Sequence, residues 1–541
     1  MAHQRSRQLT DLLLLAGFCA FLFFYGIGYF GLVGADEPRY AQVAREMLER
    51  HDWITPTLGQ KPWLEKPALF YWQAMIAFKV FGVSDWAARL PSAFDATLTV
   101  AAIYAFLRKF RPGSELDGAL MTASAAGIIT FARAASTDMP LAAMFTLAML
   151  SWYAWHETDE KWFLGMFYAF SGLGTLAKGP VAVLLAVLIV VAFAWAKSDL
   201  RVITRTLWLT GILIFCAVTL PWYIAVQWKN PEFFRVFLLE HNLARFSSDL
   251  YHHREPFWYY APIMLLASVP WTIFVLASGF EVCAAWWREK REMLRSQDAW
   301  NIFLIFWLII PVLFFSISQS KLPGYILPAV PAGTLLLAEY VRRHEQEHER
   351  TPIALAILHS IVAMAPVVPA IMVSYILAQH KLPWFTGTKI LFTLAAILAA
   401  GMAATLCSRI GLNALRFVTL VPVVLTVTAL LRIGAPVVDS LYSARSLDHE
   451  LSQLQSELPP VAVFQVRRET EYGLAFYRNQ AIDRYERGEI PAEAHLVVAP
   501  HGLQQRVASK VPGRRLSYLG SFPPQNLDYF WVAMQGAGHQ H

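Results

Sequence analysis

Long apolar runs alternate with short polar connections along most of the chain. The first run covers residues 11–30 and follows Arg5 and Arg7. Its apolar core is longer than the roughly 7 to 15 residues of a signal peptide, and it meets the roughly 20 residues that a membrane span needs. We predict an uncleaved first transmembrane helix. A cleaved signal peptide is the alternative, and the small residues at 33–35 are compatible with it.

About twelve further runs are long enough to cross a bilayer. They cover residues 91–107, 117–134, 139–155, 162–177, 179–196, 207–227, 259–285, 300–318, 324–341, 353–378, 388–407 and 414–432. The pattern therefore predicts a polytopic α-helical membrane protein with about thirteen transmembrane helices.

Composition agrees with this pattern and excludes a soluble globular protein. Of the 541 residues, 56% are hydrophobic and 16% are charged, which lies outside the usual balance of soluble domains. The 45 Lys and Arg exceed the 39 Asp and Glu by only 6, so no nucleic-acid partner is expected. The 4 cysteines show no paired spacing, which predicts neither a disulfide framework nor a metal knuckle.

Basic residues concentrate in most of the alternate connections, and only the connection near Lys161 is weakly basic. They are Arg108, Lys109 and Arg111; Lys197, Arg201 and Arg205; Arg288, Lys290, Arg291 and Arg295; Arg342, Arg343 and Arg350; and Arg409 and Arg416. By the positive-inside rule, these connections are cytoplasmic. The segments 31–90 and 228–258, and everything after about residue 435, are then expected on the outer side.

After the last run, the composition becomes more polar. Helices are predicted at 440–458 and 469–477, and short buried strands at 461–466 and 496–499. We therefore expect a small outer α/β domain over residues 436–541. It follows a membrane body over residues 1–435 that includes both outer segments. The C-terminal sequence contains no phosphate loop, nucleophile elbow or metal cluster, so we assign this domain a packing or regulatory role.

Acidic and basic residues recur among aromatic residues and prolines in the first outer segment. Two stretches carry them, Asp36-Glu37-Pro38-Arg39-Tyr40 and Trp63-Leu64-Glu65-Lys66-Pro67. A solvated helix start would explain the first stretch, since Asp and Glu favour the first turn of a helix. An aromatic belt at the membrane surface would explain the tryptophan, but it does not explain Glu65 beside Lys66.

Further charged side chains stand at the outer ends of predicted spans. They are Arg89, Arg133, Asp138, Lys178 and Lys321. Ionisable groups left unpaired in lipid are costly, so they usually face a cavity or one another. Snorkelling would explain any single lysine. The set as a whole predicts one shared polar cavity at the outer face of the membrane.

A series of short motifs resembles bacterial members of the protein O-mannosyltransferase-like glycosyltransferases, which have the GT-C fold. Besides the two stretches above, the motifs are Trp53-x-Thr55-Pro56, Arg89-Leu90-Pro91-Ser92, Ser136-Thr137-Asp138-Met139, Leu176-Ala177-Lys178-Gly179-Pro180, Glu240-His241-Asn242-Leu243 and Ser320-Lys321-Leu322-Pro323-x-Tyr325. The resemblance covers roughly residues 10–435. Ala68 departs from the usual Lys-Pro-Pro, which affects loop rigidity. Length and the outer C-terminal domain most resemble the members that transfer aminoarabinose to lipid A.

The resemblance implies an enzyme of the bacterial inner membrane, with its active site and C-terminal domain in the periplasm. It would move 4-amino-4-deoxy-L-arabinose from undecaprenyl phosphate to a lipid A phosphate. This transfer changes the charge of lipopolysaccharide and favours polymyxin resistance. The implied partners are a polyprenyl phosphate-linked sugar donor, lipid A or another periplasmic acceptor, and membrane lipids.

The resemblance also implies the site residues. Catalytic roles fall to Asp36, Glu65, Lys66 and Asp138, and substrate binding to Glu37, Arg39, Tyr40, Lys178, His241, Arg254, Lys321 and Tyr325. A lipid-phosphate leaving group needs positive charge as the anomeric C–O bond breaks. Lys66 is the first candidate for this, followed by Arg39 and Arg254. Asp36 would be a general base, or would orient an acceptor that is already ionised.

No cofactor is required by this chemistry. A divalent metal at Glu65, His252 and His253 is one interpretation of these residues. Ordinary hydrogen bonding of interfacial histidines is the other interpretation, and the one that we favour.

Two other functions stay open. The same chemistry would serve a protein hydroxyl or another glycan, in which case a base at Asp36 would be indispensable. A lipid-carrier transporter or flippase is the alternative of another class. Transporters often show matched repeats and broken helices at mid-membrane, whereas the charged groups here collect at the outer face.

Overall fold

The computed structural model describes residues 2–238, 255–288, 299–348, 350–377, 386–454 and 459–533. The chain divides into two compact units, which we call the helical unit and the mixed unit. The helical unit comprises Met1–Tyr25, Leu64–Phe70 and Arg89–Leu430, and the mixed unit comprises Gly26–Trp63, Tyr71–Ala88 and Leu431–His541. The first outer segment therefore groups largely with the C-terminal part of the chain, whereas it was predicted to belong to the membrane body.

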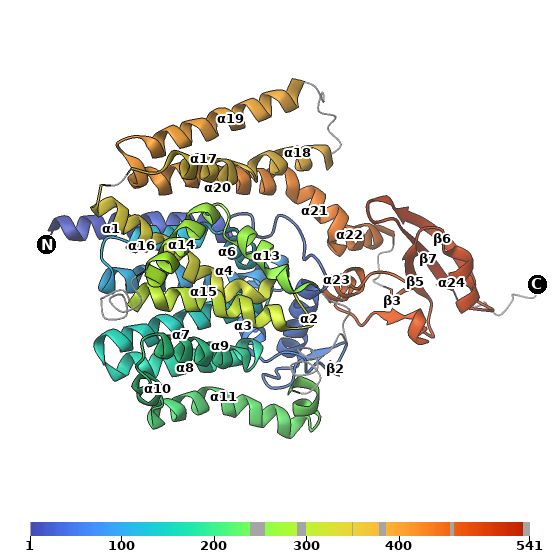
Figure 1. The fold of residues 1–541 in the computed structure, drawn as a ribbon. Helices are drawn as coiled ribbons and strands as arrows, with labels where there is room; N and C mark the ends of the chain where they lie inside the picture. The colour runs from blue at the N-terminus through green and yellow to red at the C-terminus, as the bar shows by residue number, and fades with distance from the viewer. Residues whose placement is uncertain are drawn as a thin grey trace, which may run out of the picture. The chain divides into compact units, whose positions relative to one another are not determined.

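The helices of the helical unit follow the predicted apolar runs. They are α1 (Ala2–Cys19), η1 (Ala20–Phe24), α4 (Asp85–Phe110, from Arg89 onward), α5 (Glu115–Ser124), α6 (Ala126–Ala132), α7 (Asp138–Thr158), α8 (Lys161–Lys178), α9 (Val181–Ala196), α10 (Arg201–Thr206), α11 (Leu209–Lys229), η3 (Phe257–Tyr259), α13 (Tyr260–Ala267), α14 (Thr272–Arg288), α15 (Ala299–Ile317), η4 (Pro323–Ala329), α16 (Val330–Gln346), α17 (Ile353–Met364), α18 (Val367–Leu377), α19 (Thr386–Cys407), η5 (Gly411–Ala414) and α20 (Leu415–Ala429). In Figure 1, α7, α8 and α11 lie side by side, while α17, α19 and α20 pack together as another group. The predicted α-helical body is confirmed.

Length and hydropathy single out 7 of the described helices as candidate membrane spans, or 8 if one bent pair counts as a single span. The predicted number of about thirteen came from apolar runs alone and stays a prediction. Some runs form short helices. For example, α9 has 16 residues, or about 24 Å at 1.5 Å per residue, against a hydrocarbon core of about 30 Å.

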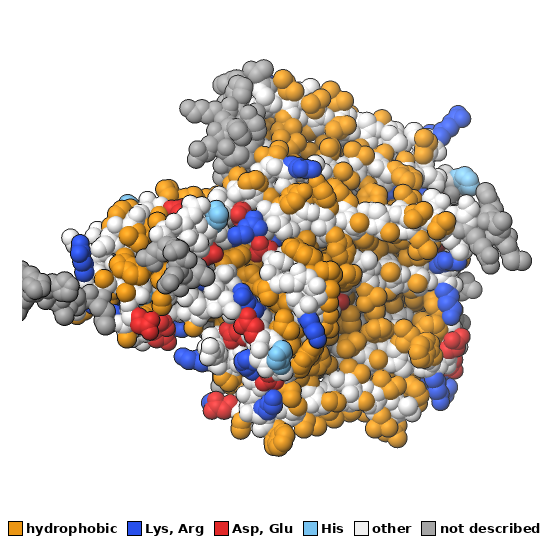
Figure 2. Space-filling view, turned by 180° about the vertical axis from the view of Figure 1, so that it is seen from behind, with side chains coloured by type: hydrophobic (Ala, Val, Ile, Leu, Met, Phe, Trp, Pro, Cys, Tyr) orange, Lys and Arg blue, Asp and Glu red, His pale blue; other side chains and the backbone are white. Residues whose placement is uncertain are grey.

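Apolar side chains also cover the outside of the helical unit. Leu209, Ile224 and Trp228 of α11 and Ile390 and Phe392 of α19 are exposed. Figure 2 shows hydrophobic side chains over most of the helical part in view, with charged side chains along its right-hand edge. Because lipid tails are as apolar as these side chains, such exposure carries no penalty in a bilayer.

Two of the predicted spans are broken, and their breaks meet. One is interrupted at Ala125 between α5 and α6, and the other bends by 116° between α13 and α14. The Ala126 N–H donates to the Val269 carbonyl oxygen at 2.8 Å, and Trp271 Nε1 donates to Ser124 Oγ at 3.0 Å. Each break thus satisfies polar groups of the other, which is a condition for interrupted helices within a bilayer.

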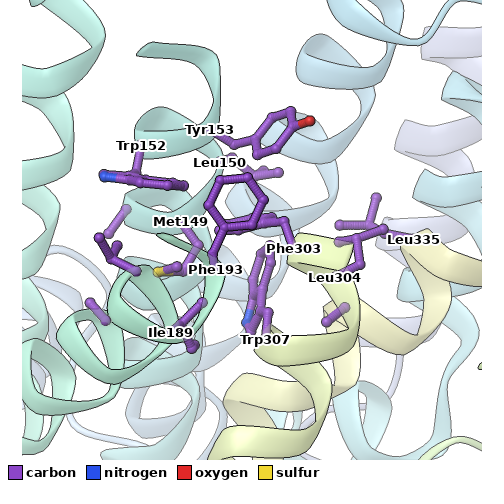
Figure 3. Packing of buried hydrophobic residues seen from close by; sticks show 14 of the residues in the cluster. Met149, Leu150, Trp152, Tyr153, Ile189, Phe193, Phe303, Leu304, Trp307 and Leu335 are labelled. Atoms are coloured by element: carbon purple, nitrogen blue, oxygen red, sulfur yellow. The ribbon is translucent and has the colours of Figure 1, made fainter. Parts of the chain in front are cut away.

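Aromatic side chains from α7, α9 and α15 fill the interior of the helical unit. Trp152, Phe193, Phe303 and Trp307 are fully buried, and Figure 3 shows their close packing. The Trp152 and Phe303 rings stack with centroids 5.4 Å apart, and Phe303 and Trp307 meet edge to face at 5.8 Å. Trp152 stands in the second half of α7 and Phe303 in the first half of α15, so this apolar core lies toward the C-terminal end of α7.

The mixed unit combines helices with a five-stranded sheet. Its helices are α2 (Asp36–Glu49), α3 (Leu69–Phe81, from Tyr71 onward), η6 (Leu430–Gly434, from Leu431 onward), α21 (Ala435–Tyr442), α22 (Ala444–Leu454), α23 (Arg468–Arg478), η7 (Tyr485–Arg487), α24 (Gln504–Lys510) and η8 (Pro523–Gln525). A short hairpin pairs β1 (Thr57–Leu58) with β2 (Lys61–Pro62). The sheet consists of β3 (Val461–Val463), β4 (Asp483–Arg484), β5 (His495–Pro500), β6 (Arg515–Phe522) and β7 (Leu527–Ala533), in the order β4-β3-β5-β7-β6. Strand β3 is parallel to both neighbours, and β7 is antiparallel to both.

The C-terminal elements agree with the sequence prediction in part. Strands β3 and β5 and helix α23 form where they were predicted. The predicted helix 440–458 is instead two helices, α21 and α22, separated by Ser443 in an extended conformation, and residues 455–458 lie outside the described part. Strands β4, β6 and β7 were not predicted. Most β6 residues are exposed or half-buried at the sheet edge, so β6 lacks the apolar run that reveals a buried strand.

Within the mixed unit, Arg445 joins the first outer segment to the C-terminal helices. Its guanidinium lies 2.9 Å from Asp85 and 3.0 Å from Asp439. The same group donates to the carbonyl oxygens of Gly28 and Tyr29. Arg445 and Asp85 are 360 positions apart in the chain, so the C-terminal helices pack directly on the first outer segment.

Candidate functional site

An ion pair at the start of α7 forms the centre of the candidate site in the helical unit. The Lys178 ammonium, at the end of α8, donates to Oδ1 of Asp138. Ser136 Oγ donates to the other carboxylate oxygen at 2.8 Å and accepts from the Asp138 N–H at 3.0 Å. The side chains are largely buried, with 17% of Asp138 and 11% of Lys178 exposed. The carboxylate is therefore held through both of its oxygens, at a helix N-terminus that favours negative charge.

Residues of the segment before α16 contact this ion pair. Lys178 Nζ lies 4.6 Å from the centroid of the Tyr325 ring, in a cation–π contact. Gly324 lies against the carboxylate, because a Cβ at this position would be 2.6 Å from Asp138 Oδ1 and 2.8 Å from Phe131 Cε1. A side chain at residue 324 would therefore displace the carboxylate or its surroundings.

Lys321, which was predicted to bind substrate, holds the backbone beside the site. Its side chain is buried, and Nζ donates to the carbonyl oxygens of Ser318 at 2.5 Å and Glu255 at 3.0 Å. The Tyr260 hydroxyl lies 3.1 Å from both the N–H and the carbonyl oxygen of Leu322. These bonds fix the segment that continues into η4. A role of Lys321 in substrate binding stays a prediction.

Glu65 and Lys66 belong to the helical unit and are half-buried in a bend before α3. The positive charge of Lys66 acts on Asp138 together with the charge of Lys178. The structure thus brings Asp138, Lys178 and Tyr325 together from distant parts of the chain, with Lys66 near enough for its charge to act on Asp138. That these residues line one polar cavity stays a prediction.

Buried Arg89 and half-buried Arg133 add positive charge at neighbouring helix ends. Arg89 in α4 is fully buried, and its charge acts on Arg133, which follows α6. Arg133 donates from Nη1 to the Leu22 carbonyl oxygen at 3.0 Å, while its Nη2 has no hydrogen-bond partner among the described residues. Buried like charges repel each other, so this region favours an anionic ligand over a cationic one.

In the mixed unit, four predicted site residues form the first turns of α2. Arg39 Nη2 donates to Asp36 Oδ1 at 2.5 Å, and 54% of the Asp36 side chain is exposed against 11% of Arg39. Glu37 is buried, and its carboxylate accepts a hydrogen bond from the Val33 N–H at 2.8 Å. Tyr40 is also buried. Asp36 is therefore accessible to a ligand, whereas Glu37 stabilises the chain entering the helix.

Aromatic rings surround the Arg39 guanidinium. Its central carbon lies 5.1 Å from the ring centroid of Tyr40, 5.2 Å from that of Trp63 and 5.7 Å from that of Tyr472. These contacts orient the guanidinium beside Asp36. Tyr472 belongs to α23, so the C-terminal domain supplies one wall of this group. Tyr472 was not predicted as a site residue, because no motif in this part of the sequence points to chemistry.

Four of the predicted site residues, His241, His252, His253 and Arg254, lie outside the described residues. Their roles stay predictions. Within the described ranges, no group of three or more His, Cys, Asp or Glu side chains is placed to hold a metal ion. The metal interpretation at Glu65 also stays a prediction, because both of its histidine partners fall outside those ranges.

The N-terminal part of the chain matches a known family. Residues 9–237 match the model described as dolichyl-phosphate-mannose-protein mannosyltransferase. Undecaprenyl phosphate-alpha-4-amino-4-deoxy-L-arabinose arabinosyl transferase 1 of Pseudomonas fluorescens is 31% identical over 319 residues, which are 57% of this chain and 55% of the relative. The undecaprenyl phosphate-alpha-4-amino-4-deoxy-L-arabinose arabinosyl transferase of Serratia proteamaculans is 30% identical over 339 residues, which are 61% of this chain and 58% of the relative. The matches thus span less than two thirds of these relatives.

Two solved structures share the fold over nearly the whole chain. ArnT from Cupriavidus metallidurans bound to undecaprenyl phosphate is 20% identical with a TM-score of 0.72, covering 98% of this chain and 99% of that one. The archaeal oligosaccharyltransferase AglB from Archaeoglobus fulgidus is 12% identical with a TM-score of 0.53, covering 98% and 75%. At these identities the likeness establishes the fold, and it confirms the predicted GT-C architecture. Together with its apolar helices, these similarities show that the chain is a multi-pass membrane protein with the GT-C fold.

Proposed function

We propose that the protein is a glycosyltransferase that moves 4-amino-4-deoxy-L-arabinose from undecaprenyl phosphate to a phosphate of lipid A. The grouping of Lys66, Lys178 and Asp138 beside Tyr325 carries this proposal. It holds fixed positive charge at the ends of membrane helices, where the phosphate of a lipid carrier would lie. The names of the related transferases support the choice of sugar and carrier.

The proposed reaction is a direct displacement at the anomeric carbon. An oxygen of the lipid A phosphate attacks this carbon while its bond to the phosphate oxygen of the carrier breaks. The electron pair of the breaking bond leaves with the carrier phosphate, so negative charge grows there in the transition state. Fixed cations beside the carrier phosphate stabilise this developing negative charge, because they need no reorganisation during the reaction. The anomeric configuration is inverted.

We assign the carrier phosphate to Lys66. The Asp138 carboxylate neutralises Lys178, so these two residues have a positioning role beside the phosphate. The charges of buried Arg89 and half-buried Arg133 make the neighbouring region more favourable for an anion. A compact lysine ammonium suits this task because it contacts phosphate as a point charge.

Asp36 is assigned to the acceptor side of the reaction, on the strength of the family resemblance. A phosphate monoester has a second pKa of about 6, so a lipid A phosphate carries an ionised oxygen near neutral pH. A base would then have no proton to remove. Asp36, which is exposed and oriented by Arg39, would instead orient the acceptor or stabilise positive charge that develops on the sugar.

The amino group of the sugar needs a carboxylate partner. Asp138 already accepts hydrogen bonds from Lys178 and Ser136 through both of its oxygens. We therefore assign the ammonium group of the sugar to Glu65, next to the phosphate ligand Lys66.

We place this site at the periplasmic face of the bacterial inner membrane. Asp138 begins α7, whereas Glu157 near the other end of α7 pairs with Arg111, which follows α4. The basic residues Arg108 and Lys109 belong to that same end of α4. By the positive-inside rule the Arg111 end is cytoplasmic, so the Asp138 end would be periplasmic.

The test is mass spectrometry of lipid A from cells that make the donor but lack their own transferase. Expression of the wild-type protein should add aminoarabinose to lipid A. Lys66→Gln should lower the transfer rate by about 100- to 1,000-fold, as expected for loss of one preorganised stabilising group. Lys61→Gln, which changes an exposed lysine, should have no effect.

Two outcomes would replace the proposal. Unchanged lipid A together with a sugar added to a protein or another glycan would assign a different acceptor. Movement of labelled carrier across the membrane without any glycosyl product would indicate a transporter.

A further inference from the structure

A polar cavity lies at the end of α7 opposite to Asp138. It has a volume of about 790 Å³, and its walls come from the ends of α4, α7, α9, α15 and α16. We call it the basic pocket. Its charged lining residues are Arg111, Glu157, Lys197, Glu339, Arg342 and Arg343.

The basic pocket is separate from the Asp138 site. Asp138 is the first residue of α7, and Glu157 is the last but one of its 21 residues, so the helix separates them by about 28 Å at 1.5 Å per residue. Between the two ends lies the apolar core of Figure 3, with Trp152 and Phe303 fully buried. A ligand in this pocket would therefore not contact the Asp138 ion pair.

Positive charge is in excess in the basic pocket. Glu157 lies 2.8 Å from Arg111, and Glu339 accepts from Arg342 Nε at 3.0 Å. Lys197 and Arg343 add two more cations to the lining. Glu281, which lies 3.3 Å from Arg343, and Asp199, whose charge acts on Lys197, are outside the lining, so it is among the lining residues that four cations face two carboxylates. The pocket therefore favours an anion.

Two buried N–H donors in the walls also lack an acceptor. Trp300 is 2% exposed, and its Nε1 has no hydrogen-bond partner among the described residues; the same holds for Nε of Arg343. A buried donor without a partner is costly. The guanidinium of Arg111 lies 5.7 Å from the Trp300 ring centroid. Oxygen atoms of a bound anion would supply acceptors in this region.

The surface beside the pocket is suited to lipid. Helix α9 ends at Ala196, and Lys197 follows directly. On the outside of α9, Leu184, Val191 and Trp195 are exposed, Trp195 to 70%. Acyl chains lying on this apolar face would bring a headgroup to the level of Lys197. A freely soluble anion has no acyl chain that could contact that face.

We propose that the basic pocket binds the phosphate headgroup of an anionic membrane phospholipid from the leaflet on this side. The headgroup phosphate would lie among Lys197, Arg343 and Trp300, with its acyl chains along α9. Basic pockets between transmembrane helices are known to recognise such headgroups. The inference does not depend on the proposed transfer reaction.

The test is native mass spectrometry of the delipidated full-length protein in detergent, with phosphatidylglycerol or phosphatidylcholine added. Wild-type protein should retain one phosphatidylglycerol molecule more tightly than phosphatidylcholine. The double variant Lys197→Gln/Arg343→Gln should bind phosphatidylglycerol about 30-fold more weakly, from the attraction of a lipid headgroup to two basic residues. Lys197→Gln alone should show about a fivefold loss, which keeps the test valid if the double variant does not fold.

The matched control is Arg108→Gln/Lys109→Gln, which removes two cations from the same end of α4 outside the pocket lining. It should keep the wild-type affinity. Equal binding of the two lipids, or wild-type affinity in both pocket variants, would overturn the proposal. Displacement of the lipid by inorganic phosphate at equal concentration would also overturn it, because the site would then serve a soluble anion.

Discussion

Gly324 touches the carboxylate of Asp138 so closely that a Cβ on Gly324 would lie 2.6 Å from Oδ1. Real Cβ contacts are essentially never shorter than 3.0 Å, so Gly324→Ala must displace η4 or the carboxylate. We expect a loss of about 1–3 kcal/mol of stability, typical of overpacking, and up to about 100-fold in transfer activity through misplacement of the ion pair.

Thermal unfolding in detergent and the rate of sugar transfer would measure both effects. Gly401→Ala is the matched control, since no atom lies within 4 Å of a Cβ built there. If Gly324→Ala matches the wild type in both measurements, the contact with Asp138 has no influence on the site.

The Asp138–Lys178 ion pair should behave as one unit. Asp138→Asn or Lys178→Met alone leaves a largely buried charge without its partner, and such losses cost about 3–5 kcal/mol. The double variant should be more stable than either single variant because no unpaired charge is left. A double-mutant cycle of unfolding free energies measures this coupling. Strictly additive losses would show that the two residues do not act together.

The helices could be predicted from the sequence, whereas their breaks could not. Every span needs a continuous apolar run, which is visible without any knowledge of the fold. The interruption at Ala125 lies inside such a run and has no local signal. It depends on the hydrogen bond from the Ala126 N–H to the Val269 carbonyl oxygen, and this contact exists only after the chain has folded.

The site could be predicted only as a set of residues. Charge at span ends and the family motifs indicated Lys66, Asp138, Lys178 and Tyr325 as members of a cavity. The pairing of Asp138 with Lys178 and its contact with Gly324 depend on atomic distances between separate helices. Nor does a motif reveal that Lys321 holds backbone carbonyl groups.

Arg445 should control how firmly the first outer segment is attached within the mixed unit. It donates to the Gly28 and Tyr29 carbonyl oxygens and pairs with Asp85 and Asp439. Arg445→Gln should therefore raise hydrogen–deuterium exchange in peptides that cover residues 26–35. Arg467→Gln, which changes an arginine that is 81% exposed, should leave exchange there unchanged. Equal exchange in the two variants would show that the Arg445 contacts do not hold the segment.

The stability of the C-terminal sheet should fall in mild acid. Burial lowers the pKa of His495 below its ordinary value of 6.5, and the ring lies 2.6 Å from both the Tyr485 hydroxyl and the Glu493 carbonyl oxygen. The unfolded state therefore binds the proton more readily than the folded state. The contribution of His495 is present above a pH of about 6.5 and is lost as the pH falls from there through the lowered pKa.

Hydrogen–deuterium exchange of the β5 peptide across this pH range, corrected for intrinsic exchange rates, measures the effect. His495→Gln should flatten the pH dependence, because glutamine does not titrate. His501→Gln, at a side chain that is 64% exposed, should keep it. An unchanged dependence in His495→Gln would assign the acid sensitivity to another group.

The most direct measurement of the proposed function is sugar transfer by purified protein in vesicles that contain undecaprenyl phosphate-aminoarabinose and lipid A. Our account predicts aminoarabinose on lipid A with an inverted anomeric linkage, release of undecaprenyl phosphate, and a rate about 100- to 1,000-fold lower for Lys66→Gln. Wild-type rates in Lys66→Gln, or no transfer to lipid A by the wild-type protein, would contradict it.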